Sequence, residues 1–71
     1  MTWHRYSAAD RERIAAEHDA YADGLLNVAR HLDAKGHTDA ADIQRNTSQA
    51  AREVADAARE SSDRLNEIVN G

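Results

Sequence analysis

The stretch Asp33-Ala34-Lys35-Gly36-His37-Thr38-Asp39 decides the fold of this 71-residue chain, because it is the one strong break in a sequence without proline. Gly36 suits the left-handed position just after a helix, and the positive charge of Lys35 suits the last helical turn. Thr38 has the side chain of a helix N-cap, and Asp39 brings a negative charge to the next first turn. The stretch therefore predicts two helices joined by a turn at residues 36–38.

Both flanking segments are expected to be long helices. The first is predicted over residues 7–35, where Ser7 can cap the first turn, and the second over residues 39–69. At ~1.5 Å per residue these helices would be about 45 Å long, and so short a turn forces them antiparallel. The expected fold is all-α: a coiled-coil-like antiparallel hairpin over residues 7–71, preceded by an aromatic segment over residues 1–6.

Apolar residues recur with heptad spacing along both segments. The first segment carries the series Ile14, His18, Tyr21, Leu25, Val28 and Leu32. The second carries Ile43, Thr47, Ala50 and Val54, and then slips by one position to Ala58, Ser61, Leu65 and Ile68. Folding at the turn would set the large residues of the first series against the smaller ones of the second, so we expect the two series to form the contact between the helices.

Alanine dominates the apolar composition, which limits what one hairpin can bury. Fifteen residues are alanine, and there is no cysteine for a disulfide. A chain this short gains only ~3–5 kcal/mol from its own core. The alanines at 8, 15, 22 and 29 run beside the first series and widen the apolar stripe to that of a helix with two neighbours. We therefore expect a second copy as the neighbour, in a two-fold dimer that forms a four-helix bundle. Another small homo-oligomer and a monomer ordered by a foreign partner are the alternatives.

Two sets of contact residues follow from this pattern. The predicted self-association seam consists of Ile14, His18, Tyr21, Ala22, Leu25, Val28, Ala29, Leu32, Ile43, Thr47, Ala50, Ala51, Val54, Ala58, Leu65 and Ile68. The candidate contacts for another protein are Trp3, Tyr6 and Leu26. Trp3 and Tyr6 have two interpretations: they fold back over Leu65, Ile68 and Val69, or they form an exposed aromatic anchor, because such residues are enriched at binding hot spots.

Charge and hydropathy argue against several classes of partner. The net charge of −4 disfavours binding to nucleic acid and to anionic membranes, because both attract basic surfaces. No stretch approaches the ~18 apolar residues of a membrane span, and the first thirty residues lack the apolar run of a secretory signal. A cytoplasmic protein is expected, and the alanine-rich composition, with arginine preferred to lysine, favours a bacterial or phage source.

Catalytic and metal-binding chemistry finds little support in the sequence. No two of the four histidines have the i, i+3 or i, i+4 spacing of a helical zinc site, and the serines lie in no nucleophile motif. We expect no enzyme activity, no metal and no cofactor. His18, within the seam, has two interpretations: a polar residue that fixes helix register, or a pH-sensitive interface group.

Arg45, Arg52 and Arg59 recur every seven residues and could contact phosphates, but acidic residues interleaved with them favour intrahelical ion pairs. The expected shape resembles the Rop-type plasmid copy-number regulators, which are helical-hairpin dimers that bind RNA. A loose similarity at Leu32-Asp33-Ala34 and Ala41-Asp42-Ile43 accompanies the shape. This resemblance implies an RNA- or DNA-binding regulator. The exposed positions of the first helix depart from it, since they are acidic at Asp10, Glu12, Glu17, Asp19 and Asp23.

The expected function is a non-catalytic protein–protein interaction module that acts as a small homo-oligomeric regulator. The alternatives are the Rop-like nucleic-acid-binding regulator and a structural component of a larger assembly.

Overall fold

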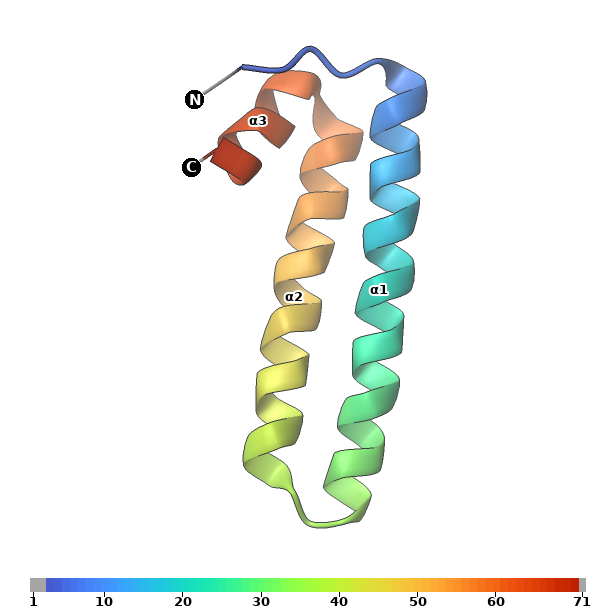
Figure 1. The fold of residues 1–71 in the computed structure, drawn as a ribbon, viewed down its shortest axis with the longest axis vertical. Coiled ribbons are helices and arrows are strands. Elements are labelled where there is room, and N and C mark those ends of the chain that lie inside the picture. The colour runs from blue at the N-terminus through green and yellow to red at the C-terminus, as the bar shows by residue number, and fades with distance from the viewer. Residues whose placement is uncertain (1–2, 71) are drawn as a thin grey trace.

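The computed structural model describes residues 3–70, so residues 1, 2 and 71 of the expected segments lie outside the described residues. The described chain contains three helices and no strand: α1 (Ala8–Ala34), α2 (Thr38–Glu60) and α3 (Ser62–Asn70). Figure 1 shows α1 and α2 side by side, with their turn at one end and α3 at the other. This part of the molecule measures 44 × 22 × 15 Å. The prediction of an all-α helical hairpin is confirmed.

The turn between α1 and α2 is a Schellman motif. The backbone N–H of His37 donates to the carbonyl of Leu32 at 2.8 Å, and that of Gly36 donates to the carbonyl of Asp33 at 3.0 Å. Gly36 has a φ of +81°, the left-handed conformation that the sequence predicts for it. The two hydrogen bonds satisfy carbonyls at the end of α1 and reverse the chain within three residues.

The helix N-termini differ in how they are capped. The Ser7 side chain accepts a hydrogen bond from the Asp10 backbone at 3.1 Å, as the sequence predicts. The expectation that Thr38 caps α2 is wrong: His37 is the N-cap, without a side-chain bond, and Thr38 is already helical. The backbone N–H of His37 belongs to the Schellman motif at the end of α1, and α2 begins at Thr38, one residue earlier than predicted.

The predicted second helix is divided at Ser61. This residue is extended, with φ −171° and ψ 164°, and its hydroxyl accepts from the backbone N–H of Arg64 at 3.0 Å. Ser61 is therefore the N-cap of α3 rather than a seam residue inside one long helix. The Arg11 guanidinium donates to the carbonyls of Ala58 and Arg59, at 3.0 and 3.3 Å, and so satisfies the carbonyl end of α2 at this break.

The contact between α1 and α2 is made by small residues. Ala15, Ala22 and Ala29, seven residues apart, are the buried residues of α1. They face buried small residues of α2, which are Ala41, Ser48, Ala51, Ala55 and Ala58. The small side chains at the centre of the contact let the two backbones approach closely, and Ser48 Oγ donates to the carbonyl of Ala22 at 2.9 Å. Each buried methyl stabilises the fold by only about 0.8 kcal/mol.

This packing corrects the prediction that the large heptad series forms the contact between the helices. Tyr21, Val28 and Ile43 are 56%, 45% and 62% exposed, although each belongs to that series. The alanine column beside the series lies inside instead. Both columns have the same seven-residue period, and close backbone approach favours the smaller side chains at the centre.

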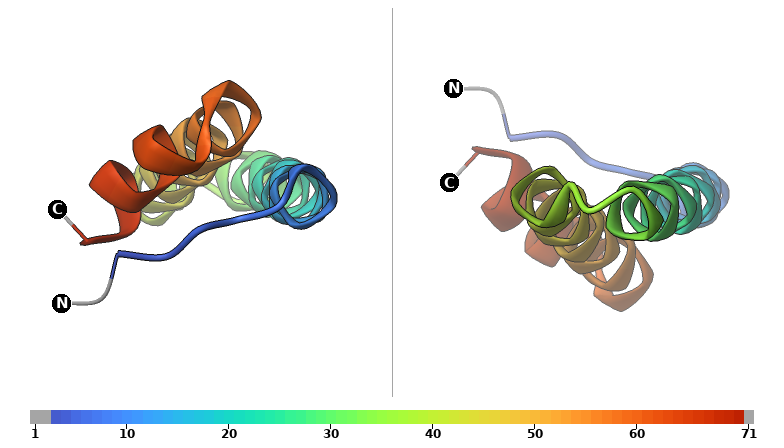
Figure 2. Two further views of the ribbon diagram at one scale, coloured as in Figure 1. Left: turned by 90° about the horizontal axis from the view of Figure 1, so that it is seen from above. Right: turned by 90° about the horizontal axis from the view of Figure 1, so that it is seen from below.

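The large apolar side chain that is fully buried, Leu65, belongs to α3. It packs against Ala15, Ala55 and Ala58, with the half-buried Tyr6, Ile14 and Val54 around it. Figure 2 shows α3 turned away from the axis of α2 and the extended segment 3–6, here called the strap, running from α1 alongside α3. The far end of the hairpin is thus closed by α3 and the strap together.

Candidate interaction surface

The hairpin has two chemically different sides, which follow from helix geometry. A helix turns by about 100° per residue, so with Ala22 facing α2, Asp19 and Asp23 fall to one side of the contact and Tyr21 and Val28 to the other. The same reasoning places Arg52 of α2 on the side of the aspartates. One side of the contact is therefore charged and the other is apolar.

The apolar face consists of residues from both helices. Its members are Ile14, Tyr21, Leu25, Val28 and Leu32 of α1, and Ile43, Thr47, Ala50 and Val54 of α2. Ile14 and Val54, near α3, are half-buried against the Leu65 cluster. Towards the turn the face opens to solvent at Tyr21, Val28 and Ile43. Contiguous exposed apolar side chains of this kind mark interaction surfaces in soluble proteins.

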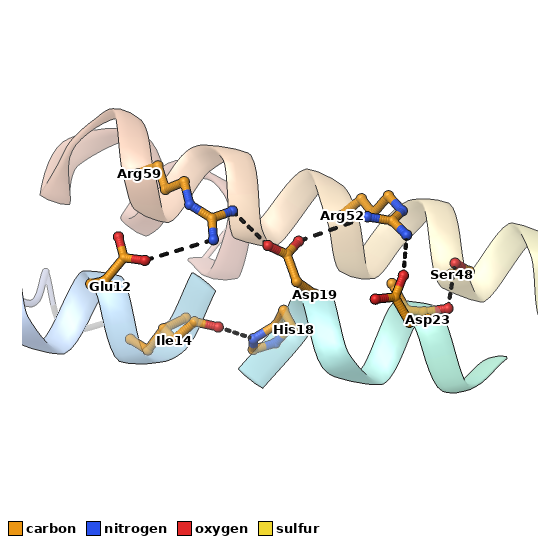
Figure 3. A network of polar contacts seen from close by, with 9 residues as sticks. Glu12, Ile14, His18, Asp19, Asp23, Ser48, Arg52 and Arg59 are labelled. Carbon is orange, nitrogen blue, oxygen red and sulfur yellow. Dashed lines mark hydrogen bonds and ion pairs between the residues drawn. The ribbon is translucent and has the colours of Figure 1, made fainter. Parts of the chain in front are cut away.

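The charged side carries a ladder of ion pairs between α1 and α2 (Figure 3). Arg59 contacts Asp19 at 2.8 Å and Glu12 at 3.7 Å. Arg52 contacts Asp23 at 2.5 Å and Asp19 at 4.0 Å. Near the turn, Arg45 contacts Asp33 at 2.6 Å and also its own helix at Asp42. We call these interhelical contacts the ion-pair ladder.

The ladder corrects the interpretation of the three arginines as an outer face of intrahelical pairs. Apart from the Arg45–Asp42 pair, the ion pairs of these arginines are with carboxylates of α1. The hydrogen bond that Arg59 donates to Asp19 raises the pKa of Arg59 above its ordinary value, and those that Arg45 donates to Asp33 and Asp42 do the same for Arg45. Arg45 and Arg59 therefore stay charged, and all three arginines contact carboxylates across the helix contact.

The structure divides the predicted seam into buried and outward-facing residues. Five of its members are buried by contacts within the chain: Ala22, Ala29, Ala51, Ala58 and Leu65. His18 and Ile68 are half-buried, and the other nine are the residues of the apolar face. Within the hairpin the buried contacts are made by these alanines and Leu65, whereas Tyr21, Val28 and Ile43 are exposed; self-association through the seam stays a prediction.

His18 makes its polar contact within α1. Its Nδ1 lies 2.8 Å from the carbonyl oxygen of Ile14, one turn earlier, and Figure 3 shows the ring beside that carbonyl. In this geometry the ring nitrogen donates and the carbonyl accepts. A register or pH role for His18 stays a prediction.

The candidate contacts for another protein lie in three different settings. Trp3 is 59% exposed, and its indole N–H donates to Asp63 at 3.2 Å. Tyr6 is half-buried against the Leu65 cluster, which agrees with the fold-back interpretation. Leu26 is half-buried, and helix geometry places it on the same side of α1 as the ladder. The structure does not bring these three residues together into one surface.

The side chain of Asn66, on α3, binds the backbone of the strap. Its Oδ1 accepts from the backbone N–H of His4 at 2.8 Å, and its Nδ2 donates to the carbonyl of the same residue. One turn earlier, the Ser62 hydroxyl accepts from the backbone N–H of Tyr6 at 2.9 Å and donates to the His4 carbonyl at 3.2 Å. Asn66 is 0% exposed, so this pair of side chains, here called the clamp, is built into the end of the hairpin.

Sequence reasoning did not find Asn66, Ser62 or Ser48 as structural residues. A signal for the first two exists in Ser61-Ser62-Asp63, a helix N-terminus signature that coincides with the slip in the heptad series. Ser48 has a heptad relation to Ala41 and Ala55, but only the observed contact identifies Ala22 as its acceptor.

Among residues 3–70, no cluster of three or more His, Cys, Asp or Glu side chains is arranged to hold a metal ion. None of the helices in the same range has the length and apolar character needed to span a bilayer.

Comparison with known proteins found no match among protein-family models, curated proteins or solved structures.

Proposed function

We propose that the chain is a non-catalytic protein–protein interaction module that acts as a small homo-oligomer through its apolar face. The observation that carries the proposal is the exposure of Tyr21, Val28 and Ile43 along one side of a hairpin with an alanine core. Exposing these residues to water is unfavourable, and burying one side chain of this size contributes ~1.5–3 kcal/mol. A partner would supply burial that the chain itself lacks.

A second copy is the partner that the face fits best. Its α1 half carries Tyr21, Leu25 and Val28, whereas its α2 half carries the smaller Thr47 and Ala50. A two-fold axis parallel to the helices would set the large half of each copy over the small half of the other. A stable interface buries ~800 Å² per partner, which sets the area that the apolar face must supply. The four-helix bundle is the assembly that this packing would form.

From the sequence composition we infer a cytoplasmic regulator of bacterial or phage origin, in which the dimer binds a further protein. The ion-pair ladder supports a protein partner over nucleic acid, because Arg45, Arg52 and Arg59 already contact carboxylates.

The test is to place charges on the apolar face and measure mass in solution. The variant Tyr21→Lys/Val28→Lys should sediment as a single chain at concentrations where the native protein sediments as a dimer, because two charges would have to be desolvated in each copy. Sedimentation equilibrium between low and high micromolar concentration makes the comparison.

A matched control carries the same charges elsewhere on α1. Ala20 and Asn27 are exposed and lie on the opposite side of the helix from the contact, so Ala20→Lys/Asn27→Lys should leave the mass unchanged. Equal masses for both variants and the native chain would refute the proposal. A mass that grows with concentration beyond a dimer would instead support a structural component of a larger assembly.

A further inference from the structure

The clamp of α3 recognises one edge of an extended peptide. In an extended chain the N–H and C=O of residue i and the N–H of residue i+2 point to the same side. Asn66 takes both groups of His4, and Ser62 takes the N–H of Tyr6, two residues later. The two clamp residues are four apart on α3, which puts them on one face of the helix.

Side-chain contacts add selectivity to this backbone recognition. Tyr6 packs against the cluster around Leu65, so the clamp sits beside an apolar surface that accepts a ring two residues after the clamped one. The rings of His4 and Tyr6 lie 5.1 Å apart, and the Trp3 indole reaches Asp63. Main-chain hydrogen bonds that supply affinity, with contacts at alternate side chains that supply selectivity, are the pattern of peptide-binding sites that add an extended strand.

We propose that the Ser62–Asn66 clamp is a binding site for an extended peptide segment with an aromatic residue two positions after the clamped residue, and that the strap fills this site in cis. The site binds such a segment from another chain when the strap is displaced. It goes beyond the proposed self-association, because none of its contacts involves the open part of the apolar face.

The strap is a competitor with a high local concentration. A segment tethered this closely has an effective concentration of ~mM, so a peptide added to the native chain must compete with it. The apparent affinity for the added peptide is reduced by the fraction of molecules with an open site. Weakening the strap without altering α3 should therefore expose the site.

The experiment uses the full chain with His4→Pro, which removes the N–H that donates to Asn66. The probe is a fluorescently labelled synthetic peptide of residues 3–7, and fluorescence anisotropy measures its binding. We expect the variant to bind the peptide at least tenfold more tightly than the native chain does. A peptide that carries proline at the position of His4 should bind neither protein. Equal affinities of the two proteins, or equal binding of the proline peptide, would overturn the proposal.

A second variant controls for a change in the fold caused by the first. Tyr6→Ala weakens the strap through its ring rather than its backbone, and should raise the affinity for the native peptide in the same direction. Adding Asn66→Ala to either variant should abolish binding while circular dichroism shows retained helix. Binding that survives loss of Asn66 would place the peptide elsewhere and refute the clamp.

Cysteine cross-linking distinguishes the two sources of the segment. The chain has no cysteine, and Arg5 and Asp63 line the same hollow beside the clamp. A full-length Arg5→Cys chain is mixed with an Asp63→Cys chain under mild oxidation. A mixed disulfide at least tenfold above either homodimer would assign the strap of another copy as the ligand. Peptide binding without this disulfide would assign a segment of a different protein.

Discussion

Alanine at the centre of the helix contact makes individual positions sensitive to added volume. Ala22 has no exposed surface, and the Ser48 hydroxyl reaches its carbonyl from α2. Extra methylene groups at such a position push the two backbones apart, which costs more than the added apolar area returns. The stability of the hairpin therefore depends on residues that contribute little burial themselves.

Substitution of one alanine tests this dependence. We expect Ala22→Leu to lower the free energy of unfolding by about 1–3 kcal/mol, through overpacking and loss of the Ser48 hydrogen bond. Ala20→Leu is the matched control, because Ala20 is exposed on the same helix and its replacement should change stability by less than about 0.5 kcal/mol. Urea denaturation at one protein concentration measures both. Similar effects of the two substitutions would contradict alanine-centred packing.

The two described glycines have opposite requirements. Gly24 lies in the middle of α1, and a Cβ added there would meet nothing within 4 Å. Alanine at this position should raise the free energy of unfolding by about 0.4–1 kcal/mol, because it restricts the unfolded chain.

Gly36 has a positive φ, so Gly36→Ala should destabilise the turn by ~1–2 kcal/mol. Thermal melts of the two variants and the native chain at one low protein concentration separate the two effects, and a stabilising Gly36→Ala would contradict the Schellman turn.

At the scale of elements, the sequence predicts the hairpin because its signals are local. Gly36 and the residues around it specify the turn, and heptad spacing, which is unbroken in the first segment and slips once in the second, specifies the two long helices. The sequence does not decide which face of α1 packs against α2. Ala22 and Tyr21 are adjacent, and both belong to columns of residues that recur every seven positions. The heptad pattern does not state which column lies inside, and only the observed close approach of the helices settles this.

The break at Ser61 and the clamp escaped prediction for a different reason. No proline or glycine marks the break, and its capping serine also fits a heptad position. The clamp bonds join residues 56–62 positions apart, and local patterns carry no information about such pairs. Of the candidate surface, the sequence identifies the members of the apolar face, but it places their contacts inside the hairpin.

The ion-pair ladder should contribute to helix register more than to stability. Asp19 and Arg59 are only partly exposed, yet solvent and salt reach both. We expect Arg59→Met to lower the melting temperature by less than Ala22→Leu does, and the difference from the native chain to disappear in ~1 M salt, where the Debye length falls to about 3 Å. Because the pKa of Arg59 is raised in the folded chain, this contribution should be fully present below the ordinary arginine pKa and be lost only as the pH rises through the higher folded value. An effect that salt leaves unchanged would contradict the ladder.

At the scale of the whole molecule, the charges on one side of the hairpin are paired by contacts within the chain, whereas apolar side chains on the other side are exposed to solvent. The ladder pairs charges across the helices, and α3 with the strap closes the end away from the turn. The apolar face between Tyr21 and Ile43 has no such cover from the described residues. The proposed self-association addresses this difference, because a second copy would bury the open side of both hairpins at once.

Sedimentation equilibrium of the native chain tests the account most directly, with Tyr21→Lys/Val28→Lys and Ala20→Lys/Asn27→Lys beside it. If the apolar face mediates self-association, we expect twice the mass of a single chain for the native protein and for the Ala20/Asn27 variant. We expect the mass of one chain for the Tyr21/Val28 variant. A native protein that remains a compact single chain at high micromolar concentration and melts cooperatively would contradict the account.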